Sequence, residues 1–160
     1  MLLHINGNYP YHSLHSELVN SLADMGYQQV ICAPQSDERY KDTYKLKRPE
    51  ILYANDIIIT AIDRIFFSKK IRKILTYIEN NIDMSNIKCI LAHTIFSDGV
   101  VAYKLNRKYG IPYSIAVRNT DINVHMKYRK HLIPLMGRTI EHTNSVIFIS
   151  PSYIQPIKKS

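Results

Sequence analysis

The sequence is poor in cysteine and has no long apolar run, and each scarcity excludes a class of protein. Two cysteines cannot form a zinc knuckle. Cys32 and Cys89 both lie within apolar strand patterns, which favours buried free thiols over a disulfide. No apolar run approaches the roughly 20 residues of a membrane span, and the N-terminus lacks the basic start of a signal peptide. We therefore expect a cytoplasmic protein.

Several chemical motifs are also missing. No G-x-G-x-x-G pattern follows the first apolar run and there is no Walker A pattern, so we do not expect the chain to cradle a dinucleotide or a nucleoside triphosphate. The G-x-S-x-G motif of serine hydrolases is absent. The seven histidines include no H-x-x-x-H pair beside carboxylates. We expect no metal and no other cofactor, and the sequence does not favour a self-contained hydrolase or dehydrogenase.

Acidic residues are outnumbered by basic ones. With 21 lysines and arginines against 13 acidic residues, the net charge is +8, which indicates an anionic partner: nucleic acid, anionic lipid or a phosphorylated substrate. Much of this charge lies in three clusters: Lys69-Lys70-Arg72-Lys73, Lys104-Arg107-Lys108 and Lys127-Arg129-Lys130. Such clusters are typical of solvated helix faces, and they would also suit peripheral contact with the inner face of the plasma membrane.

The length and the apolar pattern predict one α/β domain covering residues 1–160. Apolar runs alternate with amphipathic segments, which indicates a Rossmann-like, doubly wound, mainly parallel sheet with helices on both faces and strand order 3-2-1-4-5-6. The expected strands cover residues 2–6, 29–33, 87–92, 113–117 and 145–149, and of two β-rich fragments, 51–53 and 56–60, the second is favoured as the remaining strand. The expected helices cover residues 13–25, 66–80, about 98–109 and 134–143, a last one begins at 150–152, and residues 35–50 form a polar excursion.

Some side chains help to fix these elements. Leu14, Leu18, Val19 and Leu22 form the apolar stripe expected on the first helix, and Ile71, Ile74, Leu75 and Ile78 form that of the second. Ser97 and Asp98 offer helix-capping chemistry, and Gly110 is placed as a left-handed C-cap. Residues 126–131 are expected to form a short basic turn.

Polar residues follow three of the expected strands. Gly7 follows the first strand, His93 the fourth and Arg118 the fifth. In open parallel sheets, ligands bind at the carboxyl ends of strands, where the strand order reverses. The first and fourth strands are neighbours in the predicted order. The three loops are therefore expected to meet at one crevice.

The same segments resemble a known family, glycosyltransferase family 4. The resemblance is carried by His93 with Ser97-Asp98-Gly99, by Gly110-Ile-Pro-Tyr113, by Val117-Arg-Asn-Thr-Asp121, and by Val146-Ile-Phe-Ile-Ser-Pro-Ser-Tyr153. The opening Asn8-Tyr-Pro10, Asp24-Met-Gly26 and Ala33-Pro34 are similar as well. The resemblance implies the N-terminal, acceptor-side half of a GT-B fold, whose C-terminal donor domain lies outside the 160 residues.

The resemblance also implies a set of substrate-binding residues. In the family, a glycine-bearing loop approaches the sugar nucleotide, and Gly7, Asn8 and Tyr9 match it. The His-Gly-x-Asp motif of the family is matched by Arg118, Asn119, Thr120 and Asp121, with arginine in place of histidine. His93 and Asp98 complete the candidate set. No catalytic residue is assigned.

The residues themselves leave alternatives open. Arg118 is expected either to hold a ligand or to pair with Asp121 or Asp98. His93 is expected either to contact a ligand or to have a structural role. Asp98 either caps a helix or binds a ligand, and Asp121 either orients a sugar hydroxyl or closes its own loop. Tyr9, Tyr11 and His12 form either an acceptor platform or ordinary loop packing. Tyr9, Tyr11 and Phe96 are also expected to be exposed as an apolar patch, through which the chain would self-associate.

The leading hypothesis is thus the acceptor-binding half of a retaining glycosyltransferase that extends a polysaccharide or glycolipid. Its partners would be a nucleotide-sugar donor, bound through a second domain, and a sugar or lipid-linked acceptor. Two rivals remain. The first is a stand-alone flavodoxin-like module for a small ligand, which would need a better phosphate loop than that of Gly7. The second is a basic nucleic-acid-binding domain, which would need its cations on one continuous face.

Overall fold

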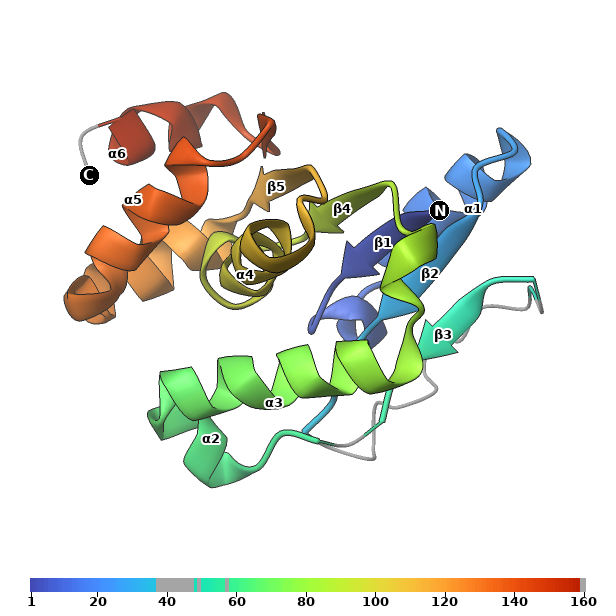
Figure 1. The fold of residues 1–160 in the computed structure, drawn as a ribbon. Coiled ribbons are helices and arrows are strands. Elements are labelled where there is room, and N and C mark those ends of the chain that lie inside the picture. Colours follow the sequence, from blue (N-terminus) through green and yellow to red (C-terminus); the bar gives the residue numbers. More distant parts are fainter. Residues whose placement is uncertain (37–47, 49, 57, 159–160) are drawn as a thin grey trace.

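A computed structural model describes residues 1–36, 48, 50–56 and 58–158, and within these the chain forms a six-stranded, all-parallel sheet (Figure 1). The strand order is β3-β2-β1-β4-β5-β6, as the sequence predicts. The strands are β1 (Leu2–Ile5), β2 (Gln29–Cys32), β3 (Leu52–Ala54), β4 (Cys89–Ala92), β5 (Tyr113–Val117) and β6 (Ser145–Phe148). The order reverses between β1 and β4, which pair in register from Leu2 opposite Cys89 to Ile5 opposite Ala92.

Helices cover both faces of this sheet, so the fold is a Rossmann-like, doubly wound α/β fold. The helices in the described part of the chain are α1 (Ser13–Asp24), α2 (Ala61–Ile65), α3 (Phe67–Asn81), α4 (Val100–Tyr109), α5 (Ile133–Glu141) and α6 (Ile154–Lys158). The larger core joins α3, α4 and α5 to one face, and the smaller core packs Val19 of α1 against Ile31 on the other face. Because strand side chains alternate, Leu3 and Ile5 enter the larger core and His4 faces α1.

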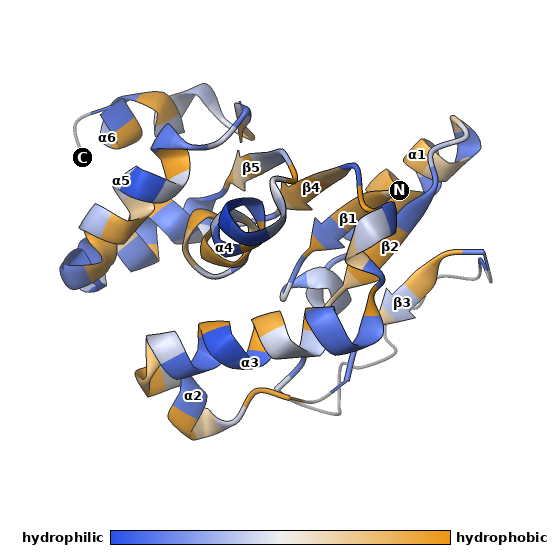
Figure 2. Ribbon diagram, viewed as in Figure 1, coloured by the Kyte–Doolittle hydropathy of each residue, from blue (hydrophilic) through white to orange (hydrophobic). Residues whose placement is uncertain are grey.

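The helix α3 shows how the sequence determines the packing. Ile71, Ile74 and Ile78 recur at helical spacing and are buried, whereas Lys69 and Arg72 are exposed. Figure 2 shows both hydrophobic and hydrophilic segments along α3. The end of α4 is also as predicted, since Gly110 adopts a positive φ of 70° as its C-cap.

The third strand was predicted in the wrong place. It is Leu52–Ala54, whereas residues 58–60 are not in a strand. The peptide N–H groups of Ile58 and Ile59 both donate to the carbonyl of Gln35, and Thr60 then caps α2. This fragment is apolar because Ile59, which is 6% exposed, is buried, and not because the fragment pairs with a neighbouring strand. Most of the excursion predicted for residues 35–50 lies outside the described residues.

Other differences concern exposure. Leu14 and Leu18 of α1 are exposed, because the buried side of that helix carries His15 and Val19. Cys89 is exposed and not buried, since it opens its strand. The segment after β5 forms two short helical turns, Asp121–Met126 and Lys130–Leu132, where a single basic turn was expected. None of the helices in the described ranges is long and apolar enough to cross a bilayer.

Candidate functional site

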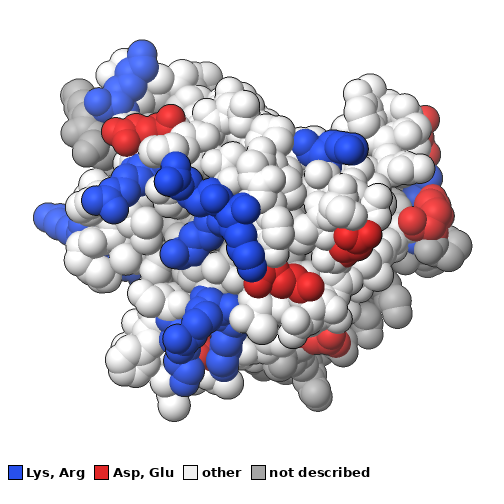
Figure 3. Space-filling model, in the orientation of Figure 1, with Lys and Arg blue, Asp and Glu red and all other residues white. Residues whose placement is uncertain are grey.

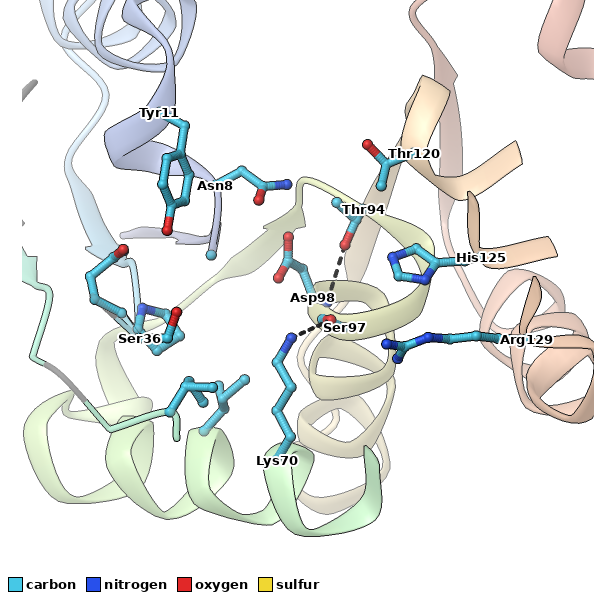
Figure 4. Close-up of a pocket in the computed structure, with 15 residues that line it drawn as sticks. Asn8, Tyr11, Ser36, Lys70, Thr94, Ser97, Asp98, Thr120, His125 and Arg129 are labelled. Atoms are coloured by element: carbon cyan, nitrogen blue, oxygen red, sulfur yellow. Dashed lines mark hydrogen bonds between the residues drawn. The ribbon is translucent and has the colours of Figure 1, made fainter. Parts of the chain in front are cut away.

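A cavity of about 260 Å³ lies at the carboxyl ends of β1, β2, β4 and β5, on the α3 side of the sheet (Figure 4). Gly7 and Asn8 follow β1, Gln35 follows β2, and the loop with Thr94, Ser97 and Asp98 follows β4. The cavity therefore lies at the point where the strand order reverses, which is where open parallel sheets bind ligands.

The loop after β4 is a single wide helical turn, Ile95–Gly99, that leads into α4. Gly99 donates its N–H to the carbonyl of Thr94 at 2.8 Å, and a Cβ at Gly99 would lie only 3.0 Å from that oxygen. The glycine thus permits the wide turn. The Thr94 hydroxyl caps it by accepting from the peptide N–H of Asp98 at 3.4 Å. The sequence predicted Asp98 or Ser97 as the cap, and the structure gives this role to Thr94.

Asp98 instead forms part of the cavity wall. It is 3% exposed, and one carboxylate oxygen, Oδ2, has no hydrogen-bond partner among the described residues. Burial raises the pKa of Asp98 to about 7, whereas the charge of Lys70 and the peptide N–H of Gly7 act in the opposite direction. A buried carboxylate with an unpaired oxygen is costly to maintain, and it is a common feature of binding sites.

Basic side chains converge near Asp98. Lys70 of α3 donates from Nζ to Oγ of Ser97 at 2.9 Å, and Figure 4 shows Arg129 pointing into the same space. Figure 4 shows His125 beside Arg129, and its ring centroid lies 4.9 Å from that of Phe96. Burial, together with the charges of Arg129 and Lys70, lowers the pKa of His125 to about 4. At neutral pH this wall therefore carries two cations and a neutral imidazole.

Asp121 holds the loops after β4 and β5 together. It is fully buried, its Oδ1 accepts from the N–H of Ile95 at 3.0 Å, and its Oδ2 accepts from the N–H of Arg118 at 3.0 Å. Burial raises the pKa of Asp121 to about 6, and these N–H groups oppose that rise. Of the two roles considered for this residue, the contacts show that it closes its loop.

A second polar assembly lies under α1, on the other face of the sheet. The guanidinium of Arg118 donates from Nε to the carbonyl of His93 at 2.9 Å, and its Nη2 lies 3.3 Å from Nδ1 of His93 and 3.4 Å from Nδ1 of His15. Nε2 of His93 lies 3.2 Å from Nδ1 of His4, and Nε2 of His4 lies 2.8 Å from Oε1 of Gln29. We call these five residues the histidine chain.

The partners fix the tautomers in the histidine chain. Gln29 donates from Nε2 to the carbonyl of Val19, so its Oε1 accepts and His4 carries its proton on Nε2. His4 then accepts at Nδ1 from His93, and His93 accepts at Nδ1 from Arg118. All donors and acceptors along this line match. Burial lowers the pKa of His4 and of His15 to about 4 and that of His93 well below its usual value, so all three are neutral.

The candidate residues thus divide between two places. Gly7, Asn8 and Asp98 line the cavity, whereas His93 and Arg118 belong to the histidine chain. Asn119 is exposed and accepts a hydrogen bond from Asn123. The expected pairing of Arg118 with an aspartate is replaced, among the described residues, by its bonds to the histidines.

The predicted exposure of the apolar patch is wrong for two of its three residues. Tyr9 and Phe96 are each 1% exposed, and only Tyr11 is exposed, at 44%. The ring of Tyr9 packs 5.1 Å from that of Tyr53 and 6.2 Å from that of His15, which is loop packing and not an open platform. The self-association that was expected through this patch therefore loses its basis.

Sequence reasoning missed several members of the cavity wall: Gln35, Lys70, Ser97, His125 and Arg129. Lys70 and Arg129 were noticed as members of basic clusters, but only the fold brings α3 and the segment after β5 to one place. No group of three histidine, cysteine or acidic residues in the described ranges is arranged to hold a metal ion.

The chain was also compared with known proteins. No protein-family model matches it, and neither does any curated protein. The resemblance to glycosyltransferase family 4 therefore carries no independent support, and function has to be argued from the cavity.

Proposed function

We propose that this chain is the acceptor-side domain of a retaining glycosyltransferase, which transfers a sugar from a nucleotide-sugar to a polysaccharide or glycolipid acceptor. The observation that carries the proposal is the cavity at the reversal point, with one unpaired carboxylate oxygen at Asp98 and cations at Lys70 and Arg129. Sugars are recognised through hydroxyl hydrogen bonds, and lysine and arginine side chains bind phosphate groups, so both features suit a sugar acceptor that carries phosphate.

In this proposal the domain positions the acceptor hydroxyl, and a second domain presents the donor. The hydroxyl oxygen forms a bond to the anomeric carbon as the bond from that carbon to the diphosphate breaks. The hydroxyl proton passes to the departing diphosphate, which leaves on the same face of the sugar. No covalent nucleophile is needed from this domain, and its contribution is orientation of the acceptor.

The test is a transfer assay on the protein encoded by the whole open reading frame that contains these residues. We expect release of nucleoside diphosphate to depend on a donor, an acceptor and the carboxylate of Asp98, with Asp98→Asn reducing kcat/KM for the acceptor about tenfold. The matched control is Glu141→Gln, an exposed carboxylate on α5. The proposal would be contradicted if the protein consumed none of a full panel of nucleotide-sugars with membrane lipid extract present as acceptor.

We also propose that the protein meets its acceptor at an anionic membrane surface. Ile62, Ile65 and Phe66, at the junction of α2 and α3, are 56%, 78% and 61% exposed. The neighbouring basic residues were expected to lie in separate clusters. Figure 3 shows them gathered on one face over α3 and α4, and Arg72 and Lys104 border one hollow there.

Not every cation of the first cluster serves this surface. Lys73 pairs with Asp63 at 2.5 Å, and Lys70 points into the cavity. Exposed isoleucines beside the remaining cations favour a lipid interface over nucleic acid, because buried apolar area and charge both contribute to lipid binding.

Vesicle sedimentation tests the membrane proposal. The chain should bind vesicles that contain phosphatidylserine, leave neutral ones unbound and dissociate as salt rises. The double change Ile65→Ser and Phe66→Ser should weaken binding about tenfold, whereas Ile147→Ser, an exposed isoleucine on β6, should not. Equal binding to anionic and neutral vesicles at low salt would refute it.

A further inference from the structure

We infer that the cavity binds a phosphorylated sugar, with its hydroxyl groups on Asp98 and Gln35 and its phosphate between Lys70 and Arg129. This inference deepens the proposed function by naming the class of acceptor. It rests on that function only in calling the sugar phosphate an acceptor, because its binding follows from the cavity.

The part of the inference that concerns the sugar hydroxyl groups, called here the hydroxyl half, rests on two buried acceptor atoms. Oδ2 of Asp98 and Oε1 of Gln35 have no hydrogen-bond partner among the described residues, and the two side chains are 3% and 1% exposed. The orientation of the Gln35 amide is fixed, because its Nε2 donates to the carbonyl of Ala33 at 2.6 Å. Two buried acceptors in one cavity call for a ligand that offers donors, and a sugar offers several.

The phosphate-binding part of the inference rests on the basic side chains near Asp98. Lys70 and Arg129 extend into the cavity from different segments, and Ser97 adds a hydroxyl beside Lys70 at 2.9 Å (Figure 4). Nδ1 of His125 is buried there without a hydrogen-bond partner in the described structure. An ammonium, a guanidinium and a hydroxyl around one space form a typical phosphate environment.

The size of the cavity limits the ligand. Pockets for drug-sized ligands measure roughly 300–1,000 Å³, and this cavity, at about 260 Å³, suits one sugar ring with a phosphate. A neutral sugar would bring no negative charge to Lys70 and Arg129. Inorganic phosphate offers fewer hydroxyl donors to the two acceptors than a sugar phosphate does. The two walls together therefore favour a molecule that carries both kinds of group.

Isothermal titration of the purified chain with three probes tests the inference: glucose 6-phosphate, glucose and inorganic phosphate. We expect the sugar phosphate to bind at least about tenfold more tightly than either of the others. An alkyl phosphodiester of glucose separates two sources of the same chemistry. Tighter binding of the diester indicates a lipid-linked head group, and tighter binding of the monoester indicates a free sugar phosphate.

Variants assign the two halves. Lys70→Met should weaken glucose 6-phosphate and inorganic phosphate about tenfold, whereas Lys88→Met, which removes an exposed lysine at the amino end of β4, should change neither. Asp98→Asn should weaken glucose 6-phosphate and leave inorganic phosphate unweakened. Thermal unfolding confirms that each variant is folded.

The inference is overturned if glucose 6-phosphate binds no better than inorganic phosphate, or if Lys70→Met and Lys88→Met behave alike. If Asp98→Asn does not fold, the comparison of the three probes on the unchanged chain still decides the hydroxyl half. Failure of the transfer assay with intact sugar-phosphate binding would refute the proposed function and leave this inference standing.

Discussion

The two polar assemblies on opposite sides of the sheet have similar burial and different hydrogen bonding. In the histidine chain, both ring nitrogens of His4 and of His93 have partners, from Arg118 at one end to Gln29 at the other. In the cavity, atoms of Asp98 and Gln35 that are equally buried have none among the described residues. A satisfied buried network stabilises a fold, whereas an unsatisfied one lowers its stability unless a ligand completes it.

The difference separates structure from function among residues that look alike in sequence. His93 and Asp98 follow the same strand, five positions apart, and both were candidates for the substrate site. His93 points toward α1, where its hydrogen bonds are complete, and Asp98 lines the cavity on the α3 side. The satisfied residue is the structural one, and the unsatisfied residue is the one expected to contact a ligand.

Removing Arg118 should have the largest effect on stability. Arg118→Met leaves Nδ1 of His93, Nδ1 of His15 and the carbonyl of His93 without their donor. We expect the free energy of unfolding to fall by about 3 kcal/mol, because each orphaned buried acceptor costs about 1–3 kcal/mol and part of the site is open to water. Urea denaturation followed by circular dichroism measures this change.

The control for this change is Arg107→Met, which removes an exposed arginine from α4 and should alter the free energy of unfolding by less than about 0.5 kcal/mol. Equal effects of the two variants would show that the histidine chain does not stabilise the fold. The histidine chain would then not differ from the cavity as a stabilising network.

The sequence predicted the sheet well because the signals were local. Each apolar run is bounded by turn residues, and alternation with amphipathic helices leaves few possible strand orders. It failed for the third strand, because a short apolar fragment such as Ile58 and Ile59 can be buried without joining a ladder. It failed for α1 because helical spacing does not reveal that the buried side carries His15.

The cavity could be predicted only in part. Gly7, Asn8 and Asp98 were found because neighbouring parallel strands bring their carboxyl ends together, and the strand order was correct. Lys70 and Arg129 come from α3 and from the turn after β5, and no motif marks them. Which buried atoms are left unpaired depends on side-chain directions, and these follow from packing that the sequence does not reveal.

Replacing Asp98 should have a smaller effect of the opposite sign. Because burial raises the pKa of Asp98 to about 7, the folded protein binds this proton more tightly than the unfolded chain does. The contribution of Asp98 to stability therefore falls as pH rises from about 4, the usual pKa of aspartate, and reaches its lowest value above pH 7. Asp98→Asn removes this penalty, so it should stabilise the protein at pH 8 by about 2 kcal/mol and by little near pH 4.

The contribution of the histidines to the free energy of unfolding depends on pH in the opposite direction. The effect of Asp98 can therefore be separated from theirs. Their pKa values are lowered by burial, so they reduce stability only as pH falls below about 6.5, in the variant and the unchanged chain alike. The difference in unfolding free energy between Asp98→Asn and the unchanged chain, measured from pH 4 to 8, thus isolates the aspartate. Glu141→Gln, at an exposed carboxylate, should give a difference near zero throughout. A difference for Asp98→Asn that is destabilising at pH 8 would mean that this carboxylate is satisfied in the folded protein, and the cavity would then resemble the histidine chain instead of contrasting with it.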